Sequence, residues 1–256
     1  MIDPRAAIDP AAELDEGVKV GPFSVIGAGV QIGKGTEIGS HVVIKGPTTI
    51  GCDNRIFQFA SVGEDPQDLK YDGEATRLEI GDRNRIREYV TLHRGTVQDE
   101  GVTSIGSDNL FMAYAHIAHD CRIANHVVLS NSASLAGHVV IDDWAILSGF
   151  VGVHQFCRIG AYSFAGAGAL LFKDIPPFVT ATGSPAVPHG INREGLTRRG
   201  FGKSQIHDIR MAYKILYRQG LKLDEALLLM QKLVANTPEV GMMVDFIRAS
   251  KRSIVR

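Results

Sequence analysis

The sequence is poor in aromatic residues, which make up 7% of its 256 residues. It has three cysteines, Cys52, Cys121 and Cys157, with no pairing pattern, which argues against a disulfide framework and is typical of a reducing compartment. The longest apolar run, residues 165–172, is far too short to cross a bilayer, so we expect no integral membrane segment. The first residues lack the basic and apolar regions of a signal peptide. These absences predict a cytoplasmic globular protein.

Glycine is abundant, with 28 residues, and suits a fold with many tight turns. The net charge is only −1, but the charges are unevenly distributed. Residues 190–256 hold 13 Lys or Arg and 6 Asp or Glu, a balance of +7, and the remainder holds 14 and 22, a balance of −8. A basic end on an acidic protein favours an anionic ligand or an acidic partner, although a solvated helical surface explains the charge equally well. Nothing in the sequence indicates a nucleic-acid partner.

An aliphatic residue recurs every six residues from Ile2 to Leu171, and 24 of the 26 positions in this frame are Ile, Leu or Val. Neither a helix nor a single strand has this period, but three short strands joined by turns close a coil of 18 residues around an aliphatic interior. Coils stacked at the strand spacing of ~4.8 Å form a parallel β-helix. The pattern resembles the hexapeptide-repeat family, whose coils are left-handed. We therefore predict an all-β left-handed parallel β-helix over residues 1–190.

Two segments, at about 63–79 and 97–104, abandon the frame and are predicted to leave the β-helix as surface loops. The second lies within a spacing of 13 residues from Leu92 to Ile105, one more than two hexads. Loops on a rigid scaffold often carry binding residues. Tolerated insertion is the alternative, and it has more weight for the second loop.

Residues 191–256 are predicted to form a small C-terminal α-helical domain. A linker turn from Gly183 to Gly190 precedes it. Helical periodicity then extends over residues 204–219, 223–236 and 238–252. Candidate N-terminal caps are Ser204, Asp224 and Thr237, the last followed by a proline.

Five of the nine histidines fall between His116 and His154. The 18-residue coil places Gly137–His138 and His154–Gln155 above His119, near one edge and ~5 Å apart. Such a ladder suits a metal site, a general base oriented by Asp120, or a set of donors for a phosphate. The unobstructed N–H of Gly137 is a natural oxyanion donor, which favours the second and third uses together. Cys121 falls at a small core position, so we do not expect it to be a nucleophile.

Several motifs in chain order carry a more specific resemblance. They are Gln67–Tyr71, Ile86–Glu88, His93–Thr96, His116–Cys121, Leu135–His138, Val153–Phe156 and Asn192–Phe201. Together they resemble the acyl carrier protein-dependent UDP-N-acetylglucosamine O-acyltransferases, which begin lipid A synthesis, and the resemblance covers essentially the whole chain.

The resemblance implies a homotrimer with active sites between subunits. It implies transfer of an (R)-3-hydroxyacyl group from acyl carrier protein to the 3-position of the glucosamine of UDP-N-acetylglucosamine, although the residues do not distinguish a 3-hydroxyl from a 3-amino acceptor. His119 would be the general base, Asp120 would orient it, and the N–H of Gly137 would hold the oxyanion. No metal is implied, and no cofactor beyond the phosphopantetheine of the carrier protein.

The remaining site residues are also implied by the resemblance alone. The residues that match substrate-binding positions are Gln67, Asp68, Lys70, His116, His138, His154, Gln155, Asn192, Glu194, Arg198 and Arg199. Ala167 matches a position that limits acyl length, where a residue larger than glycine shortens the groove. We therefore expect an acyl chain somewhat shorter than the longest that the family accepts.

Three alternatives are open. The sister N-acyltransferase of the same pathway carries an extra N-terminal uridine-binding domain, whereas the repeat here begins at residue 2. A γ-type carbonic anhydrase would bind zinc through histidines of two subunits. A structural or ice-binding β-helix would present flat ladders of threonine, and none occur here.

Overall fold

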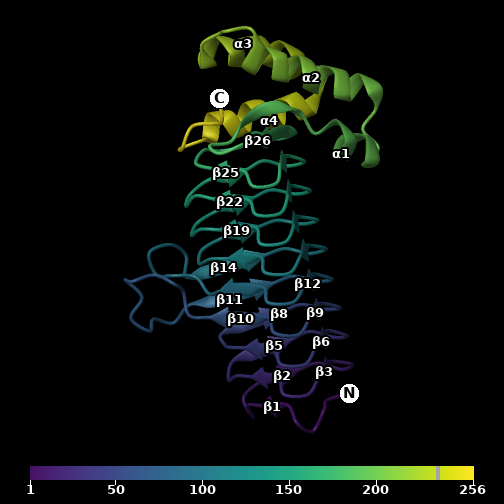
Figure 1. Ribbon diagram of the computed structural model, residues 1–256, viewed down its shortest axis with the longest axis vertical. Helices are drawn as coiled ribbons and strands as arrows, with labels where there is room; N and C mark the ends of the chain where they lie inside the picture. The colour runs from purple at the N-terminus through teal and green to yellow at the C-terminus, as the bar shows by residue number, and fades with distance from the viewer. Residues whose placement is uncertain (235–236) are drawn as a thin grey trace.

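The computed structural model, which describes residues 1–234 and 237–256, is a column of stacked triangular coils with helices packed on its C-terminal end (Figure 1). Each coil contributes a short strand to each of three sheets, which we name by their first strands. Successive strands pair in parallel 18 residues apart, as Ala7 does with Val25. In the described part of the chain the β1, β2 and β3 sheets hold nine, eight and ten strands.

The β1 sheet consists of β1 (Ala7–Ile8), β4 (Val25–Ile26), β7 (Val43–Ile44), β10 (Ser61–Glu64), β13 (Thr91–His93), β16 (His116–Ile117), β19 (Ser134–Leu135), β22 (Gly152–Val153) and β25 (Leu170–Leu171). The β2 sheet consists of β2 (Glu13–Leu14), β5 (Val30–Ile32), β8 (Thr48–Ile50), β11 (Arg77–Ile80), β14 (Val102–Ile105), β17 (Arg122–Ile123), β20 (Val140–Ile141) and β23 (Arg158–Ile159). The β3 sheet consists of β3 (Lys19–Val20), β6 (Glu37–Ile38), β9 (Arg55–Ile56), β12 (Arg85–Ile86), β15 (Leu110–Phe111), β18 (Val128–Leu129), β21 (Ile146–Leu147), β24 (Phe164–Ala165), β26 (Val179–Thr182) and β27 (Val187–Ile191).

The core is the aliphatic frame that the sequence predicts. Frame residues point inward, and Ile44, Leu92 and Leu135 are each 0% exposed. A small residue in each turn, such as Cys121 at 0%, fills the coil corner, so its predicted core position is confirmed. Burial of an aliphatic side chain of this size contributes about 1.5–3 kcal/mol, repeated in every layer. The predicted left-handed parallel β-helix with a C-terminal helical region is confirmed.

The two interruptions of the frame leave the column at the same corner, between the β1 and β2 sheets (Figure 1). The register pairs Ser61 with Thr91 and Thr91 with His116, which are thirty and twenty-five residues apart, so the loops add twelve and seven residues to a coil. The spacing of 13 from Leu92 to Ile105 is therefore one hexad plus seven inserted residues. Its interpretation as two hexads plus one inserted residue is wrong. Residues 65–76 form the first loop and residues 94–101 the second, because residues 102–104 belong to β14.

The chain after the last coil differs from the predicted linker. Residues 187–191 form β27, which pairs antiparallel with β26, so the turn is confined to residues 183–186. Four helices follow in the described residues, and the first was not predicted. They are α1 (Arg193–Arg198), α2 (Lys203–Arg218), α3 (Leu223–Val234) and α4 (Pro238–Ala249).

The helix caps follow the predictions only in part. Thr237 is the N-cap of α4 with Pro238 after it, as predicted, although its hydroxyl donates to Asp208 instead of capping. Ser204 and Asp224 are not caps, because α2 begins one residue earlier after Gly202, and Asp224 lies inside α3. The predicted helix end at Asn236 lies outside the described residues. Among those residues, no helix combines the length and apolar character that crossing a membrane requires.

Candidate active site

His119 and Asp120 lie in the turn between β16 and β17, at the corner where both loops leave the column. Asp120 adopts a left-handed conformation, with φ of 59°, which aspartate tolerates better than most residues. Its side chain is 0% exposed, whereas that of His119 is 14% exposed. The turn therefore buries the carboxylate and leaves the imidazole at the surface of the corner.

The Asp120 carboxylate orients the imidazole. Its Oδ2 lies 2.8 Å from Nδ1 of His119, and it also accepts hydrogen bonds from the N–H of Thr96 (2.8 Å to Oδ1) and the hydroxyl of Thr96 (2.6 Å to Oδ2). Burial, the largest influence, raises the pKa of Asp120, but the hydrogen bonds from His119 and Thr96 together outweigh it and lower this pKa. An ionised Asp120 fixes the proton of His119 on Nδ1, and Nε2, which has no partner in the described chain, is then a free base.

Gly137 lies directly against the His119 ring. A Cβ at this position would lie 2.5 Å from Cε1 and 2.7 Å from Nε2 of His119, so a side chain would displace the ring. Gly137 is buried, yet its N–H makes no hydrogen bond within residues 1–234 and 237–256. A free base and an unpaired N–H donor therefore occupy the same corner.

His138 lies on the next coil, with its ring 5.2 Å from that of His119 and stacked on Phe156 at 4.4 Å. Its Nδ1 lies 3.3 Å from Oδ2 of Asp99, which Arg122 holds with contacts of 3.0 Å to both oxygens. Thr96 and Asp99 were missed in the sequence because they belong to the second loop. Reading the spacing of 13 as a hexad plus a seven-residue insertion would have placed that loop at the His119 corner.

A cleft of about 1050 Å³, here named the corner cleft, opens beside His119 between the two loops and the end of α4. It brings together six residues that the sequence predicts for the site: His119, His138, Gln155, Gln67, Asp68 and Lys70. Four further cations line it and were not predicted: Arg122, Arg158, Lys251 and Arg252. The cleft is therefore suited to a polar, anionic ligand.

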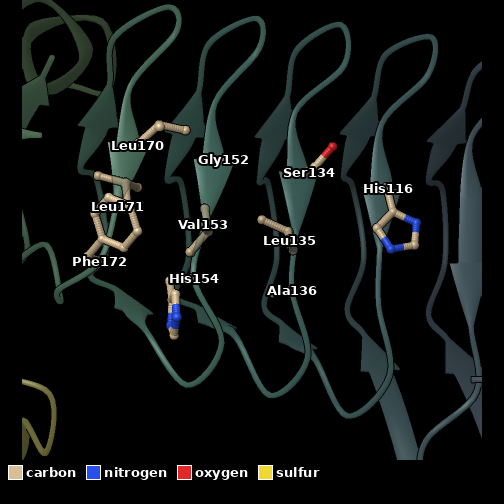
Figure 2. Close-up of a pocket in the computed structure, with 10 residues that line it drawn as sticks. All are labelled: His116, Ser134, Leu135, Ala136, Gly152, Val153, His154, Leu170, Leu171 and Phe172. Carbon is tan, nitrogen blue, oxygen red and sulfur yellow. The ribbon is translucent and has the colours of Figure 1, made fainter. Parts of the chain in front are cut away.

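A second cavity of about 390 Å³, here named the sheet groove, runs across the outer face of the β1 sheet from His116 to Phe172 (Figure 2). Its floor follows the outward positions of four strands, which pair in register: His116, Ser134, Gly152 and Leu170. The missing side chain of Gly152 leaves the groove open, since a Cβ there would lie 2.9 Å from Cδ2 of Leu170. The apolar lining suits a hydrocarbon chain.

Two predicted histidines belong to this groove. His154 shares the His119 corner, as predicted, but its side chain lies in the sheet groove and that of Gln155 lies in the corner cleft. Nδ1 of His116 shares a hydrogen bond of 2.7 Å with the hydroxyl of Thr91. Burial first, and then His93 and His119, lower the pKa of His116 to about 4, so it is neutral at pH 7.

Four of the residues that the resemblance implies for substrate binding, namely Asn192, Glu194, Arg198 and Arg199, lie elsewhere, and the resemblance matches them to the nucleotide-binding end. Asn192 donates from Nδ2 to the carbonyl of Tyr162 at 2.9 Å and caps α1. The Arg199 guanidinium lies 4.3 Å above the ring of Trp144. Both contacts are at the corner between the β2 and β3 sheets. The other two, Glu194 and Arg198, are exposed on α1, and none of the four lines the corner cleft.

Ala167 is exposed in the turn between β24 and β25 and does not line the sheet groove, so its role in acyl length remains a prediction.

One cluster in the described residues could offer three metal ligands, namely His119, Asp120 and His138, whose ligand atoms lie within 4.8 Å of one another. Oδ2 of Asp120 already accepts from the Thr96 hydroxyl and faces Nδ1 of His119. This arrangement favours a hydrogen-bonded pair over a cation site, and the absence of a metal remains a prediction.

The fold and the site define a class. Residues 2–46 match the family described as bacterial transferase hexapeptide (six repeats). The left-handed β-helix, with a His–Asp pair at one corner and an apolar groove and a basic cleft nearby, places the chain in the class of hexapeptide-repeat transferases. Residues 174–255 match the family described as UDP N-acetylglucosamine O-acyltransferase, domain 2.

Full-length relatives identify the family. The chain is 57% identical to the acyl-[acyl-carrier-protein]–UDP-N-acetylglucosamine O-acyltransferase of Halorhodospira halophila, with 100% of this chain and 99% of that protein covered. It is 59% identical to the protein of the same name from Stutzerimonas stutzeri, again with 100% and 99% covered. The solved UDP-N-acetylglucosamine acyltransferase of Francisella novicida superposes with a TM-score of 0.98 at 46% identity, over 100% of this chain and 94% of that one. The chain belongs to the family of acyl-[acyl-carrier-protein]–UDP-N-acetylglucosamine O-acyltransferases and is an acyltransferase.

Proposed function

We propose that this chain transfers an (R)-3-hydroxyacyl group from acyl carrier protein to the 3-hydroxyl of the glucosamine in UDP-N-acetylglucosamine, the first step of lipid A synthesis. The names of the relatives support the donor and the acceptor. The observation that carries the mechanism is the free Nε2 of His119 against Gly137, with Nδ1 fixed by a buried carboxylate. No cofactor is needed beyond the phosphopantetheine that carries the acyl group.

The chemistry is a direct acyl transfer. Nε2 of His119 takes the proton of the sugar hydroxyl as its oxygen bonds to the thioester carbon. The N–H of Gly137 donates to the oxyanion of the tetrahedral intermediate. The C–S bond then breaks, and the thiolate leaves with the proton that His119 accepted. Asp120 stabilises the imidazolium that exists between these steps.

His119 lines the corner cleft, and Ala136 of the sheet groove is adjacent in the chain to Gly137, which lies against His119, so the two cavities suggest where each substrate binds. The acyl chain fits the apolar sheet groove, which His116 and His154 also line (Figure 2). The sugar fits the corner cleft, where Asp68, Lys70 and His138 offer charged and hydrogen-bonding groups. A neutral His116 is suited to a hydrogen bond with the substrate and not to an ion pair.

We further propose a homotrimer with each active site between two copies. Asn192 and Arg199 lie at one corner of the column and His119 lies at another, so one chain does not bring them into one cleft. A neighbouring copy could place its Asn192 and Arg199 corner against the His119 corner of this copy. It would then complete the site with four residues of the nucleotide-binding end: Asn192, Glu194, Arg198 and Arg199. The same contact between copies would cover both the bound sugar nucleotide and the sheet groove.

The test is an assay of the purified enzyme with UDP-N-acetylglucosamine and a panel of 3-hydroxyacyl carrier proteins of different length. We expect the wild type to be active, and His119→Ala to lower kcat by about 10²- to 10⁴-fold, the usual contribution of a general base. Full activity of His119→Ala would exclude it as the base. Stoichiometric zinc in the purified protein, with loss of activity on chelation, would instead favour the metal-dependent alternative.

A further inference from the structure

The second loop is folded around Thr96. The carbonyl of Thr96 accepts hydrogen bonds from the N–H of Asp99 (3.3 Å) and of Gly101 (3.1 Å), which closes the loop on itself. Gly95 permits this, because a side chain there would collide with the backbone nitrogen of Val102. Thr96 itself is 1% exposed. The loop therefore presents this residue to the interior of the corner and not to solvent.

Both remaining hydrogen-bonding groups of Thr96 are directed at Asp120. The N–H donates to Oδ1 at 2.8 Å and the hydroxyl donates to Oδ2 at 2.6 Å, so one residue supplies two of the three donors on a carboxylate that is 0% exposed. Thr103 contacts the same aspartate differently, since its hydroxyl accepts from the backbone N–H of Asp120 at 2.8 Å. Thr103 fixes the turn, whereas Thr96 fixes the plane of the carboxylate.

We propose that Thr96 is a positioning residue for the acyl transfer, holding the Asp120 carboxylate in the plane that keeps Nε2 of His119 over Gly137. This inference rests on the proposed function. Without the hydroxyl, Oδ1 still accepts from the N–H of Thr96, but Oδ2 keeps only its contact with Nδ1 of His119, so the plane of the carboxylate is held less tightly. The orientation of the imidazole is then fixed less tightly, while the carboxylate, with one donor fewer, interacts more strongly with a protonated ring.

The experiment compares Thr96→Val, which keeps the shape and removes the hydroxyl, with Thr96→Ser, which retains the hydroxyl. Thr76→Val is the matched control, because Thr76 is a buried threonine near the same loops, 2% exposed, whose Oγ1 has no partner in the described chain. For each variant, kcat, the KM for UDP-N-acetylglucosamine and the pH profile of kcat/KM are measured. Circular dichroism verifies folding.

We expect Thr96→Val to lower kcat about ten- to a hundredfold, as for loss of a hydrogen bond to a charged group felt in the transition state, with KM changed less than about twofold. The acid limb of the profile should move to higher pH, because the freed carboxylate favours the protonated imidazole. The titratable groups facing the pair, His138, His116, His93 and Asp99, are the same in every variant. Thr96→Ser and Thr76→Val should behave like the wild type.

A folded Thr96→Val with wild-type kcat and an unmoved acid limb would overturn the proposal, as would equal losses in the Val and Ser variants. If Thr96→Val does not fold, Thr96→Cys replaces it, since a thiol of similar size is a weak donor. Equal activity of the Cys and Ser variants would then refute the role of the hydroxyl. Failure of the proposed function is distinguishable, because the wild type itself would not transfer the acyl group.

Discussion

Burial disfavours the charged form of two histidines beside the active corner. His93 is 4% exposed and lies 5.2 Å from His116, ring centre to ring centre. Burial is the main cause that lowers the pKa of both side chains. His119 lowers both further, and His93 also lowers the pKa of His116. His93 and His116 can therefore lie beside the active corner without adding positive charge to it.

This burial predicts a pH dependence of stability. The pKa of His116 is about 4 in the folded protein and about 6.5 when unfolded, so its contribution is fully present above pH 6.5 and is lost as the pH falls towards 4. Between pH 7 and pH 4.5 we expect His116 to account for about 2 to 3 kcal/mol of lost stability. Urea unfolding of the wild type and of His116→Gln at both pH values measures this difference.

The comparison isolates His116, because His93 and the other titratable groups remain in both proteins. The free energy of unfolding should fall less steeply with pH in His116→Gln than in the wild type. Parallel pH dependence in the two proteins would mean that His116 is protonated equally in the folded and unfolded states.

At the scale of elements, the first loop is held by a single buried side chain. Arg94, whose side chain is 8% exposed, donates to the carbonyls of Gly63 (2.7 Å) and Gly46 (3.2 Å) and to the hydroxyl of Tyr71 (3.1 Å), and it pairs with Asp65. Three of these partners lie in or next to the first loop. That loop carries Asp68 and Lys70 into the corner cleft. By holding the loop in place, Arg94 therefore positions two residues that line the cleft.

Arg94→Leu should therefore release the first loop. The substitution leaves two carbonyls without their partner, which costs about 3 kcal/mol, and most of this cost falls on the loop. We expect tryptic cleavage after Lys70 to become at least about tenfold faster, since proteolysis follows local opening. Mass spectrometry of the peptides measures this rate.

Arg77→Leu is the control for this prediction. Arg77 lies at the other end of the loop, but its side chain is 52% exposed and, within residues 1–234 and 237–256, pairs only with Glu79. Cleavage after Lys70 should be unchanged in this variant. Equal acceleration in both variants would assign the loop's order to surface charge and not to the buried guanidinium.

The elements also show which features the sequence could predict. The hexad frame determines the three sheets, the core position of Cys121 and the contact of Gly137 with His119, because each follows from counting in a regular coil. For Thr96 and Asp99 the count could give only the corner at which their loop leaves the column, since an inserted segment has no regular coil geometry that would predict the contacts of its side chains. Ser204 is a good cap by residue type, but the N–H of Gly202 donates to Oε1 of Gln205 at 2.8 Å, so Gly202 is the N-cap and α2 begins at Lys203.

At the scale of the whole molecule, the predicted site residues occupy two different corners. His119 lies between the β1 and β2 sheets, and Arg199 packs on Trp144 between the β2 and β3 sheets. A contact between two unlike surfaces closes into a ring when the rotation permits, and three copies form the smallest such ring beyond a dimer. In the proposed trimer, each copy gives His119 to one site and Arg199 to the next.

This arrangement predicts that two inactive variants can restore each other. His119→Ala and Arg199→Ala chains with different tags are co-expressed, and trimers that contain both chains are isolated by tandem purification. Either composition of a mixed trimer has a single interface at which an intact His119 meets an intact Arg199 of the neighbour. We therefore expect about one third of the wild-type activity, measured at a UDP-N-acetylglucosamine concentration below KM, while each variant alone stays inactive. If His119 and Arg199 acted within one chain, no site in any mixed trimer would contain both, and the mixed trimers would be as inactive as their parents.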